Sequence, residues 1–446
     1  MTDVVVGAGE RTFVVERRGV QPVPAAERRG RPSNQFTMWL GANLTIADFA
    51  LGFLAVTLGL PWALAVGAVL VGNVLGAAAL AAAAAMGPSY GLPQMVLVRG
   101  AFGSFGGRLP ALLNYVSTLG WYTVNTILAS FGLVLLIPGL AFWQGALALV
   151  LVQAVLGVYG HHLVHGFERA MSVVLGLLFL ALTVYVLTRH GALAGYHPAG
   201  HGRWPAFAIM VAAALSYVGS WSPYGADYSR YLPAGTSRGA VARWAFLGAF
   251  VASAWLELLG TAVAVLAGGH AANATAAAHS VLGGFGDLAV VAIILGGVAA
   301  NAVNVYSNSL SAGAVGLALP RWALAVLASG IGLAASLASF GNFASDYEDF
   351  LLLLGYWFTP WLGVQAVDFY LLRRRGVDRP GRGAVAVPAL AAFLVGIGAE
   401  IPFMSSTLYT GPVAASLGGA DVSFYLGFTV AGLAYLLLGR RTRGRS

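Results

Sequence analysis

The sequence predicts an all-α polytopic membrane protein with twelve transmembrane helices. Its composition is the first reason: 59% of the 446 residues are hydrophobic and only 9% are charged, whereas soluble domains carry about a quarter charged residues. The second reason is that apolar runs recur along the whole chain, each near the roughly 20 residues that a helix needs to cross a bilayer. The third is the placement of the basic residues, all of which are arginines.

The apolar segments follow one another closely, and proline or glycine marks most junctions between them. A polar tail, residues 1–33, precedes the first segment without an apolar core typical of a cleavable signal, and a short tail, residues 439–446, follows the last. The segments are approximately 36–60, 61–86, 109–137, 141–160, 168–189, 205–231, 238–268, 287–313, 321–340, 346–374, 383–405 and 416–438.

The arginines predict how the chain is oriented. With the N-terminus in the cytoplasm, every arginine except Arg189 and Arg203 falls in a cytoplasmic tail or loop, as the positive-inside rule requires. A different number of crossings would reverse the later loops and destroy this asymmetry. We therefore expect an integral plasma (inner) membrane protein with both termini in the cytoplasm. The net charge of +8 is spread along the chain and does not indicate a nucleic-acid partner.

Two apolar segments contain helix breakers and polar groups near mid-membrane, in residues 39–52 and 216–227. Irregular backbone is tolerated at that depth only where it lines a cavity. Interrupted helices at matching places, five segments apart, are typical of inverted-repeat transporters, whose substrates bind beside the breaks. We therefore expect two five-helix repeats, residues 34–189 and 190–375, followed by two accessory helices in residues 376–438.

Trp121 and Trp221 lie deeper than the membrane interface where tryptophans usually anchor. Trp121 is near the middle of its segment, and Trp221 lies in the predicted break of the sixth segment. Two indole faces could enclose a planar ligand, because stacking contributes roughly 1–3 kcal/mol per base. Tight helix packing is the alternative for either residue.

Polar side chains accompany these tryptophans. Asn125 lies one turn after Trp121 and Thr118 lies three residues before it, on the same helix face; Asn304 lies in a polar stretch of the eighth segment. A carboxamide offers both donors and an acceptor, which suits the edge of a nucleobase. Interhelical hydrogen bonding is the alternative, and it is the better explanation for Asn301, Asn308 and Ser309.

Asp48 and Glu257 are the acidic residues nearest mid-membrane. Intramembrane carboxyl groups are costly and indicate an ion or proton pathway. A protonated carboxyl group bonded to a neighbouring helix is the alternative, and it weighs more for Glu257. The sequence contains no cysteine and no recognisable nucleophile–base set, phosphate-binding loop or acidic metal cluster, so we expect neither an enzyme nor a bound cofactor or metal.

Four motifs carry a family resemblance: residues 43–52 (NLTIADFALG), 119–121 (LGW), 227–231 (DYSRY) and 354–358 (LGYWF). Together they resemble the nucleobase:cation symporter-1 family, particularly its purine–cytosine permeases, over residues 34 to 375. The resemblance implies a LeuT-type fold with the substrate between helices 1, 3, 6 and 8. The substrate-binding residues it implies are Trp121, Trp221, Asn125, Asn304 and Thr45. Ser220, beside Trp221, is expected to offer a further contact.

The coupling cation is expected to be a proton rather than sodium. The resemblance implies that the carbonyl groups of Gly41 and Leu44 form part of a sodium site, completed by hydroxyl groups of helix 8. Those hydroxyl positions hold Val298 and Ala299, which have no side-chain oxygen. Proton coupling, with Asp48 as the candidate residue, is the hypothesis that remains.

The sequence therefore predicts a symporter that imports cytosine or a purine by alternating access. The nearest alternative is the same fold carrying allantoin, a hydantoin, uracil or thiamine. A channel or a membrane receptor is the alternative of a different class. Channels are expected to show rings of charge or carbonyl filters, and receptors a sizeable soluble domain, and neither is visible here.

Overall fold

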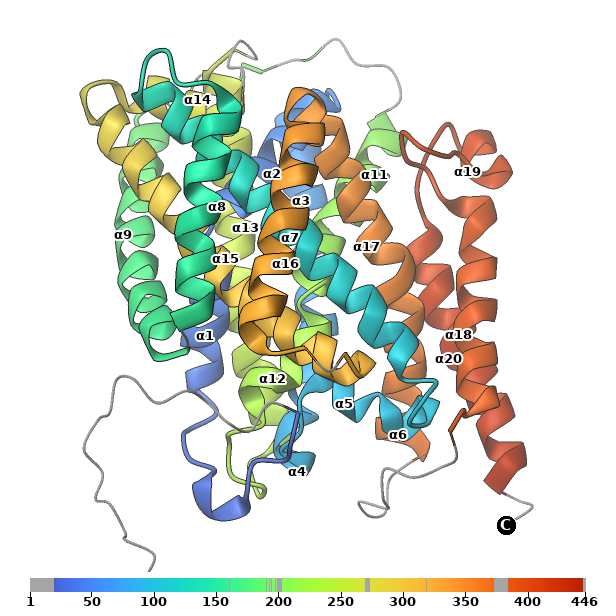
Figure 1. Cartoon of the computed structure of the whole chain (residues 1–446). Coiled ribbons are helices and arrows are strands. Elements are labelled where there is room, and N and C mark those ends of the chain that lie inside the picture. The colour runs from blue at the N-terminus through green and yellow to red at the C-terminus, as the bar shows by residue number, and fades with distance from the viewer. Residues whose placement is uncertain are drawn as a thin grey trace, which may run out of the picture.

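The computed structural model describes residues 20–443, except for 160, 190, 192, 194, 197, 199–202, 269–272, 318 and 373–383. The described residues form an all-helical protein (Figure 1), and their only β-type pairing is an isolated bridge between Ser405 and Thr410. Many helices run nearly parallel from one end of the molecule to the other, with shorter helices at both ends. This confirms the predicted all-α fold.

The first apolar segment is broken in two, as predicted. Helix α1 (Asn34–Asn43) and helix α2 (Ile46–Thr57) meet at an angle of 59°. Thr45 lies in the break with an extended backbone, and its hydroxyl group accepts a 3.3 Å hydrogen bond from the Asp48 N–H. This N-cap compensates for one of the backbone donors that the start of α2 leaves without a helical partner.

The sixth segment is also broken at the predicted place. Helix α11 (Arg203–Gly219) ends just before Ser220 and Trp221. A 3-10 turn, η2 (Ser222–Tyr224), and the short helix α12 (Gly225–Ser229) follow. Pro223 lies in that turn and has no N–H with which to continue an α-helix.

The unbroken helices pack in two groups. In the first, α13 (Arg238–Leu266) packs on α1 and α2, and α3 (Trp62–Ala84) packs on both α11 and α13. The second group is built around α7 lying along α15, with α8 along α16 and α9 against α15. Its helices are α7 (Arg108–Leu136), α8 (Phe142–Tyr159), α9 (His161–Leu187), α15 (Gly286–Val315) and α16 (Arg321–Ser339).

The last long helices lie at one edge of the molecule, where α18 (Val387–Glu400) and α20 (Ser423–Arg443) pack on α17 (Phe343–Ala366). A π-helical turn, Val367–Leu372, follows α17. Helix α20 runs beyond residue 438, where the last segment was predicted to end. The short helices are η1 (Ala25–Glu27), α4 (Gly87–Tyr90), α5 (Gln94–Leu97), α6 (Arg99–Phe102), α14 (Ala274–Leu282), η3 (Gly283–Phe285), η4 (Phe340–Asn342), η6 (Ile401–Phe403) and α19 (Pro412–Ser416).

The described part of the N-terminal tail is docked on the helices. The Arg28 guanidinium group donates hydrogen bonds to the carbonyl oxygens of Val23, Pro88 and Tyr90, at 2.8, 2.9 and 3.2 Å. These bonds hold residues 23–28 against α4. Residues 1–19 of the predicted tail lie outside the described residues.

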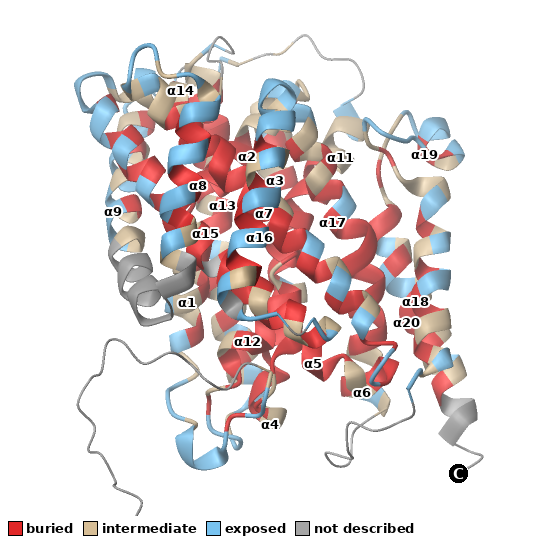
Figure 2. Cartoon of the chain, in the orientation of Figure 1, coloured by how far each residue is buried: buried red, intermediate tan, exposed pale blue. Residues whose placement is uncertain are grey.

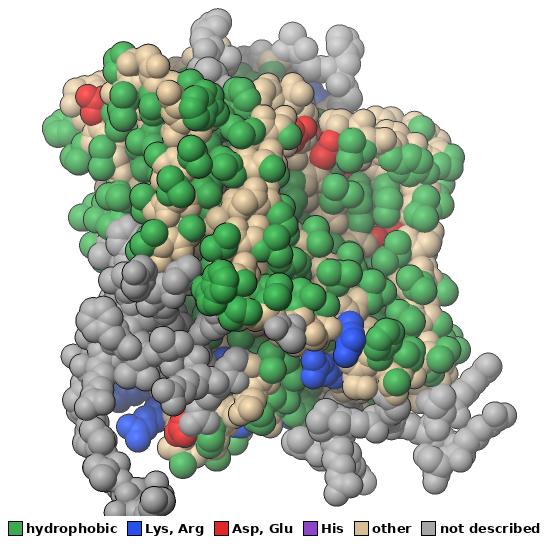
Figure 3. Space-filling model, viewed as in Figure 1, with side chains coloured by type: hydrophobic (Ala, Val, Ile, Leu, Met, Phe, Trp, Pro, Cys, Tyr) green, Lys and Arg blue, Asp and Glu red, His purple; other side chains and the backbone are tan. Residues whose placement is uncertain are grey.

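The surface is that of an integral membrane protein. Among the described residues, six helices are long and apolar enough to cross a membrane, or seven if the bent pair α1 and α2 counts as one span. Buried residues concentrate in the central helices, while α9, α18 and α20 present exposed outer faces (Figure 2). Large apolar side chains on those outer faces are exposed, such as Leu177 (63%) and Leu437 (66%). Figure 3 shows apolar side chains over the flank and arginines at the lower end.

Candidate functional site

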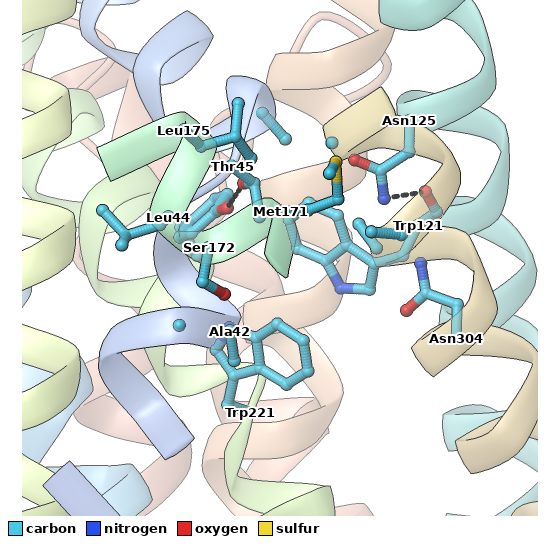
Figure 4. A pocket seen from close by; sticks show the side chains of 16 residues that line it. Ala42, Leu44, Thr45, Trp121, Asn125, Met171, Ser172, Leu175, Trp221 and Asn304 are labelled. Carbon is cyan, nitrogen blue, oxygen red and sulfur yellow. Dashed lines mark hydrogen bonds between the residues drawn. The ribbon is translucent and has the colours of Figure 1, made fainter. Parts of the chain in front are cut away.

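A pocket lies where the two broken helices meet α7, α9 and α15 (Figure 4). The break in α1–α2 places Thr45 in its wall, and the break after α11 places Trp221 there. The structure thus brings together most of the residues that the sequence singled out. The lining residues are Gly41, Ala42, Leu44, Thr45, Ala47, Trp121, Asn125, Met171, Ser172, Leu175, Tyr217, Trp221, Gly296, Ala299, Ala300 and Asn304.

The two tryptophans are held by neighbouring side chains. The Trp121 ring lies edge-on to Tyr217 and to Phe350, with ring centroids 5.1 Å apart in both pairs. The Trp221 ring nitrogen donates a 2.9 Å hydrogen bond to Asn43 Oδ1. Both indole rings line the pocket at two levels, with Met171 and Ser172 beside them (Figure 4). Because their rings are fixed by neighbours, they offer a pre-organised aromatic surface to a ligand.

Two carboxamides lie on the Trp121 side of the pocket (Figure 4). Asn125 donates a 3.0 Å bond to the Trp121 carbonyl oxygen, and its Oδ1 is buried without a protein partner. Asn304 donates a 3.2 Å bond to Asn301 Oδ1. A buried acceptor without a partner is rare in folded proteins, so Asn125 Oδ1 offers a place for a ligand N–H group. Asn301 itself donates to the Tyr122 carbonyl oxygen at 2.9 Å, which confirms its structural interpretation.

Two residues predicted to contact substrate lie outside the pocket lining. The Thr118 hydroxyl group donates to the Tyr115 carbonyl oxygen and accepts from Asn308 Nδ2, both at 2.6 Å. The Ser220 hydroxyl group donates to the Tyr217 carbonyl oxygen at 2.8 Å. Both groups are therefore engaged in bonds within and between helices. Thr118 shares a helix face with Trp121, and Ser220 is next to Trp221 in the sequence, but neither relation places the side chain in the pocket lining.

Several residues at the site were not singled out from the sequence, among them Tyr217, Asn43, Met171 and Ser172. Tyr217 lines the pocket and shares a 2.9 Å hydrogen bond with the Thr45 hydroxyl group; its position in the polar stretch 216–227 was an available signal. Asn43 orients Trp221 and is the last residue of α1 before the first break, which was a similar signal. Met171 and Ser172 come from α9. Nothing in the sequence around them indicates that this part of the helix lines a pocket.

The residues proposed for a cation are divided between the pocket and its surroundings. Gly41 and Leu44 line the pocket, and the Ser172 hydroxyl oxygen lies 3.0 Å from where a Cβ on Gly41 would be. Val298 is buried and Ala299 lines the pocket, so these two positions supply no side-chain oxygen. Asp48 lies behind the pocket wall, fully buried. In the described part of the chain, no three His, Cys, Asp or Glu side chains gather as a metal site would require.

We expect Asn43→Ala to weaken ligand binding by roughly 2- to 10-fold, because a neutral hydrogen bond contributes about 0.5–1.5 kcal/mol. The lost bond is the one that fixes the Trp221 ring. Titration of the purified variant with a ligand of this pocket measures the dissociation constant. Asn342→Ala, at an exposed turn, is the control that should bind as the parent does. An unchanged dissociation constant for Asn43→Ala would show that ligand binding does not depend on the bond that orients Trp221.

Known proteins similar to this chain are permeases. Residues 22–428 match the family described as permeases for cytosine/purines, uracil, thiamine and allantoin. The Bacillus subtilis protein YxlA is 29% identical over 95% of this chain and 96% of its own length. The purine-cytosine permease fcyB of Emericella nidulans is also 29% identical, over 95% of this chain and 88% of its own.

Solved structures of Mhp1, a nucleobase-cation-symport-1 family transporter, share the fold. Its inward-facing conformation matches with a TM-score of 0.80 at 19% identity, covering 97% of this chain and 95% of that one. Its closed conformation with bromovinylhydantoin bound matches with a TM-score of 0.75 at 20% identity, covering 96% and 95%. The match to the permease family over most of the chain shows that this protein belongs to the nucleobase:cation symporter-1 family.

Proposed function

We propose that the protein imports a nucleobase, cytosine or a purine, together with a cation by alternating access. The observation that carries the proposal is the pocket at the two helix breaks, with two fixed indole rings and the unpartnered acceptor Asn125 Oδ1. A nucleobase has an aromatic face for stacking and N–H groups for that acceptor. The purine-cytosine permeases fcyB and the yeast FCY2, which is 26% identical to this chain, support this choice of substrate.

In this proposal each wall of the pocket has a distinct role. Trp121 and Trp221 cover the faces of the base, and Asn125 accepts from its N–H edge. Asn304 offers a second carboxamide on the same side (Figure 4). The Thr45 hydroxyl group, already bonded to Tyr217, completes the opposite edge. Carboxamides suit this task because asparagine pairs in the same way with adenine in nucleic-acid recognition.

Packing between helices supports the proposed arrangement of twelve spans with a 5+5 inverted repeat. In such a repeat, α2 of segment 1 corresponds to α11 of segment 6, and α3 of segment 2 corresponds to α13 of segment 7. The contact of α2 with α13 should therefore have a counterpart in the contact of α11 with α3, and both contacts are present. The contact of α9 with α15 should likewise correspond to the contact of α17 with α7, and both contacts are present. We propose residues 34–189 and 190–375 as the repeats and 376–438 as accessory helices, with cytoplasmic termini in the plasma (inner) membrane.

We propose that a proton is the coupling cation. Sodium is held by oxygen ligands, and the helix 8 positions expected to provide hydroxyl groups are Val298 and Ala299. Asp48 supplies an intramembrane carboxyl group within one helical turn of the pocket residue Thr45. Intramembrane carboxyl groups commonly belong to proton relays in transporters.

A related substrate is the second candidate, since the family description includes uracil, thiamine and allantoin, and Mhp1 was solved with bromovinylhydantoin bound. All of these compounds carry a planar ring and hydrogen-bonding edges. The pocket therefore supports the same transport mechanism for them. No observation on this chain favours a channel or a receptor.

Thermal stabilisation across a ligand panel tests the proposed substrate and cation together. A ligand that binds only the folded protein stabilises it by about 2.7 kcal/mol at 100 times its dissociation constant. We expect cytosine or a purine to raise the melting temperature, with an effect that changes with pH and not with sodium. Stabilisation only by allantoin, a hydantoin, uracil or thiamine would replace the substrate, and dependence on sodium would overturn the proton proposal.

A further inference from the structure

Behind the pocket wall, two carboxyl groups from different helices face one another. Asp48 on α2 and Glu257 on α13 are both fully buried, with 0% of their surface exposed. Helices α2 and α13 pack on each other, and the two acids are close enough to interact through their charges. Asn73 on α3 donates a 2.9 Å bond to Glu257 Oε2 and a second 2.9 Å bond to the Val69 carbonyl oxygen.

The donors around this pair do not match its acceptors. Both oxygens of Asp48 and Oε1 of Glu257 are buried without a hydrogen-bond partner, whereas only Glu257 Oε2 receives a bond, from Asn73. Ser253, also on α13, lies near Asp48, and its own hydroxyl group is buried without a partner, so it can donate to only one of these three oxygens. A proton on one carboxyl group would supply the missing donor and bond to an oxygen of the other. The unpartnered oxygens therefore leave a place for a proton between the two acids.

Among the described residues, the groups that interact with the pair include no compensating cation. The titratable groups that interact with it from neighbouring helices are the phenols of Tyr217 on α11 and Tyr347 on α17. In the described part of the chain, no arginine or histidine is among the charge or hydrogen-bond partners of either acid. Burying one unpaired ion costs several kcal/mol, and two adjacent carboxylates cannot both remain charged.

The helices that carry the pair are in close contact. A Cβ on Gly52 would lie 2.1 Å from the Glu257 carbonyl oxygen, and a Cβ on Gly260 would lie 1.9 Å from that of Phe49. The Thr261 hydroxyl group donates to the Gly52 carbonyl oxygen at 2.9 Å. Since glycine lets the two backbones meet here, the carboxyl groups are held opposite one another by the helix packing itself.

The pair is also connected to the substrate pocket. Thr45 and Tyr217 line the pocket and bond to each other at 2.9 Å, and the Thr45 hydroxyl group accepts from the Asp48 N–H. Tyr347 donates a 3.0 Å bond to the Ala47 carbonyl oxygen and contacts Trp121 by its edge, with centroids 6.4 Å apart. A ligand that moves Thr45 or Trp121 therefore acts on the backbone that positions Asp48.

We propose that Asp48 and Glu257 together form the binding site of the coupling proton. One proton stays shared between the two carboxyl groups, and a second proton is taken up from water on one side of the membrane and released on the other. Glu257 is thus half of the site rather than a structural residue of α13. This inference rests on the proposed function, because it names where the cation of that transport cycle binds.

The first test compares accumulation with exchange in proteoliposomes. A pH gradient of one unit supplies about 1.4 kcal/mol per proton, enough for about tenfold accumulation of substrate. We expect Glu257→Gln and Asp48→Asn each to abolish this accumulation, while exchange of labelled for unlabelled nucleobase stays within about twofold of the parent, because each amide resembles the protonated acid. If Asp48 bound the proton alone, only Asp48→Asn would lose accumulation. Glu257→Asp, which keeps an ionisable group, should retain part of it.

The matched control is Glu400→Gln. Glu400 is another fully buried acid, on the accessory helix α18, with a 2.9 Å bond from the Thr359 hydroxyl group. This variant should accumulate substrate as the parent does. Normal accumulation by Glu257→Gln, or equal loss in Glu400→Gln, would overturn the proposal.

A second measurement decides the proposal without any substrate. Infrared difference spectra between two pH values report protonation of buried carboxyl groups through their carbonyl stretching band. We expect the parent to show a pH-dependent band that both Asp48→Asn and Glu257→Gln lose and Glu400→Gln retains. Retention of that band in Glu257→Gln would contradict the shared site. Absence of nucleobase exchange in the parent would contradict the proposed substrate and leave the spectroscopic result to decide the proton site.

Discussion

Replacing Trp121 with alanine is expected to weaken nucleobase binding by roughly 10- to 100-fold. Stacking on an aromatic side chain contributes roughly 1–3 kcal/mol per base, and each 1.4 kcal/mol is a factor of ten. The loss of affinity should be near the upper end of this range, because Trp121 also packs edge-on against the rings of Tyr217 and Phe350. Binding of a radiolabelled nucleobase to purified protein measures the effect.

Trp322→Ala is the control for this variant. Trp322 lies on α16 and is 59% exposed, away from the pocket, so its loss should leave the dissociation constant unchanged. Trp121→Phe keeps an aromatic face and should fall between the parent and the alanine variant. Equal affinities for Trp121→Ala and Trp322→Ala would remove Trp121 from the binding site.

Adding one methyl group at Gly260 is expected to destabilise the protein and to abolish transport. The new Cβ would lie 1.9 Å from the Phe49 carbonyl oxygen, and a backbone atom cannot rotate away as a side chain can. Overpacking of this kind costs about 1–3 kcal/mol or more. Because α2 would have to move off α13, the break that carries Thr45 should shift with it. The melting temperature and the rate of uptake measure the two effects.

Gly330→Ala is the matched control for the Gly260 substitution. Gly330 is also a helical glycine, on α16, but a Cβ there would have no atom within 4 Å. Alanine is favoured over glycine in a helix interior by about 1 kcal/mol, so this variant should melt at or above the parent temperature. If Gly260→Ala melted at the same temperature as Gly330→Ala, the close contact of α2 and α13 would be unnecessary for stability.

The fold and its two breaks could be predicted because their signals are local. A long apolar run predicts a helix directly, and the glycine, proline and polar residues near Thr45 and Trp221 interrupt the run where the backbone bends. Depth along the helix was also sufficient to single out Trp121. These features depend on spacing along the chain, which a sequence records.

The partners of each side chain could not be predicted, because they come from helices distant in sequence. Thr118 lies on the Trp121 helix near the pocket, yet its hydroxyl group bonds to Asn308 on α15. Glu257 was interpreted mainly as a structural acid, and only the packing of α13 on α2 places it against Asp48. Rotation of a helix about its axis decides such pairings, and apolar periodicity fixes that rotation poorly when helices are apolar on every side.

Counterflow of labelled cytosine or a labelled purine into proteoliposomes tests the proposed transport activity most directly. Vesicles containing the purified protein are preloaded with unlabelled base, and external label is then followed with time. We predict rapid entry of the label that excess external base suppresses and that vesicles with Trp121→Ala lack. Label entry no faster than into protein-free vesicles, for cytosine and for every purine, would contradict nucleobase transport by this protein.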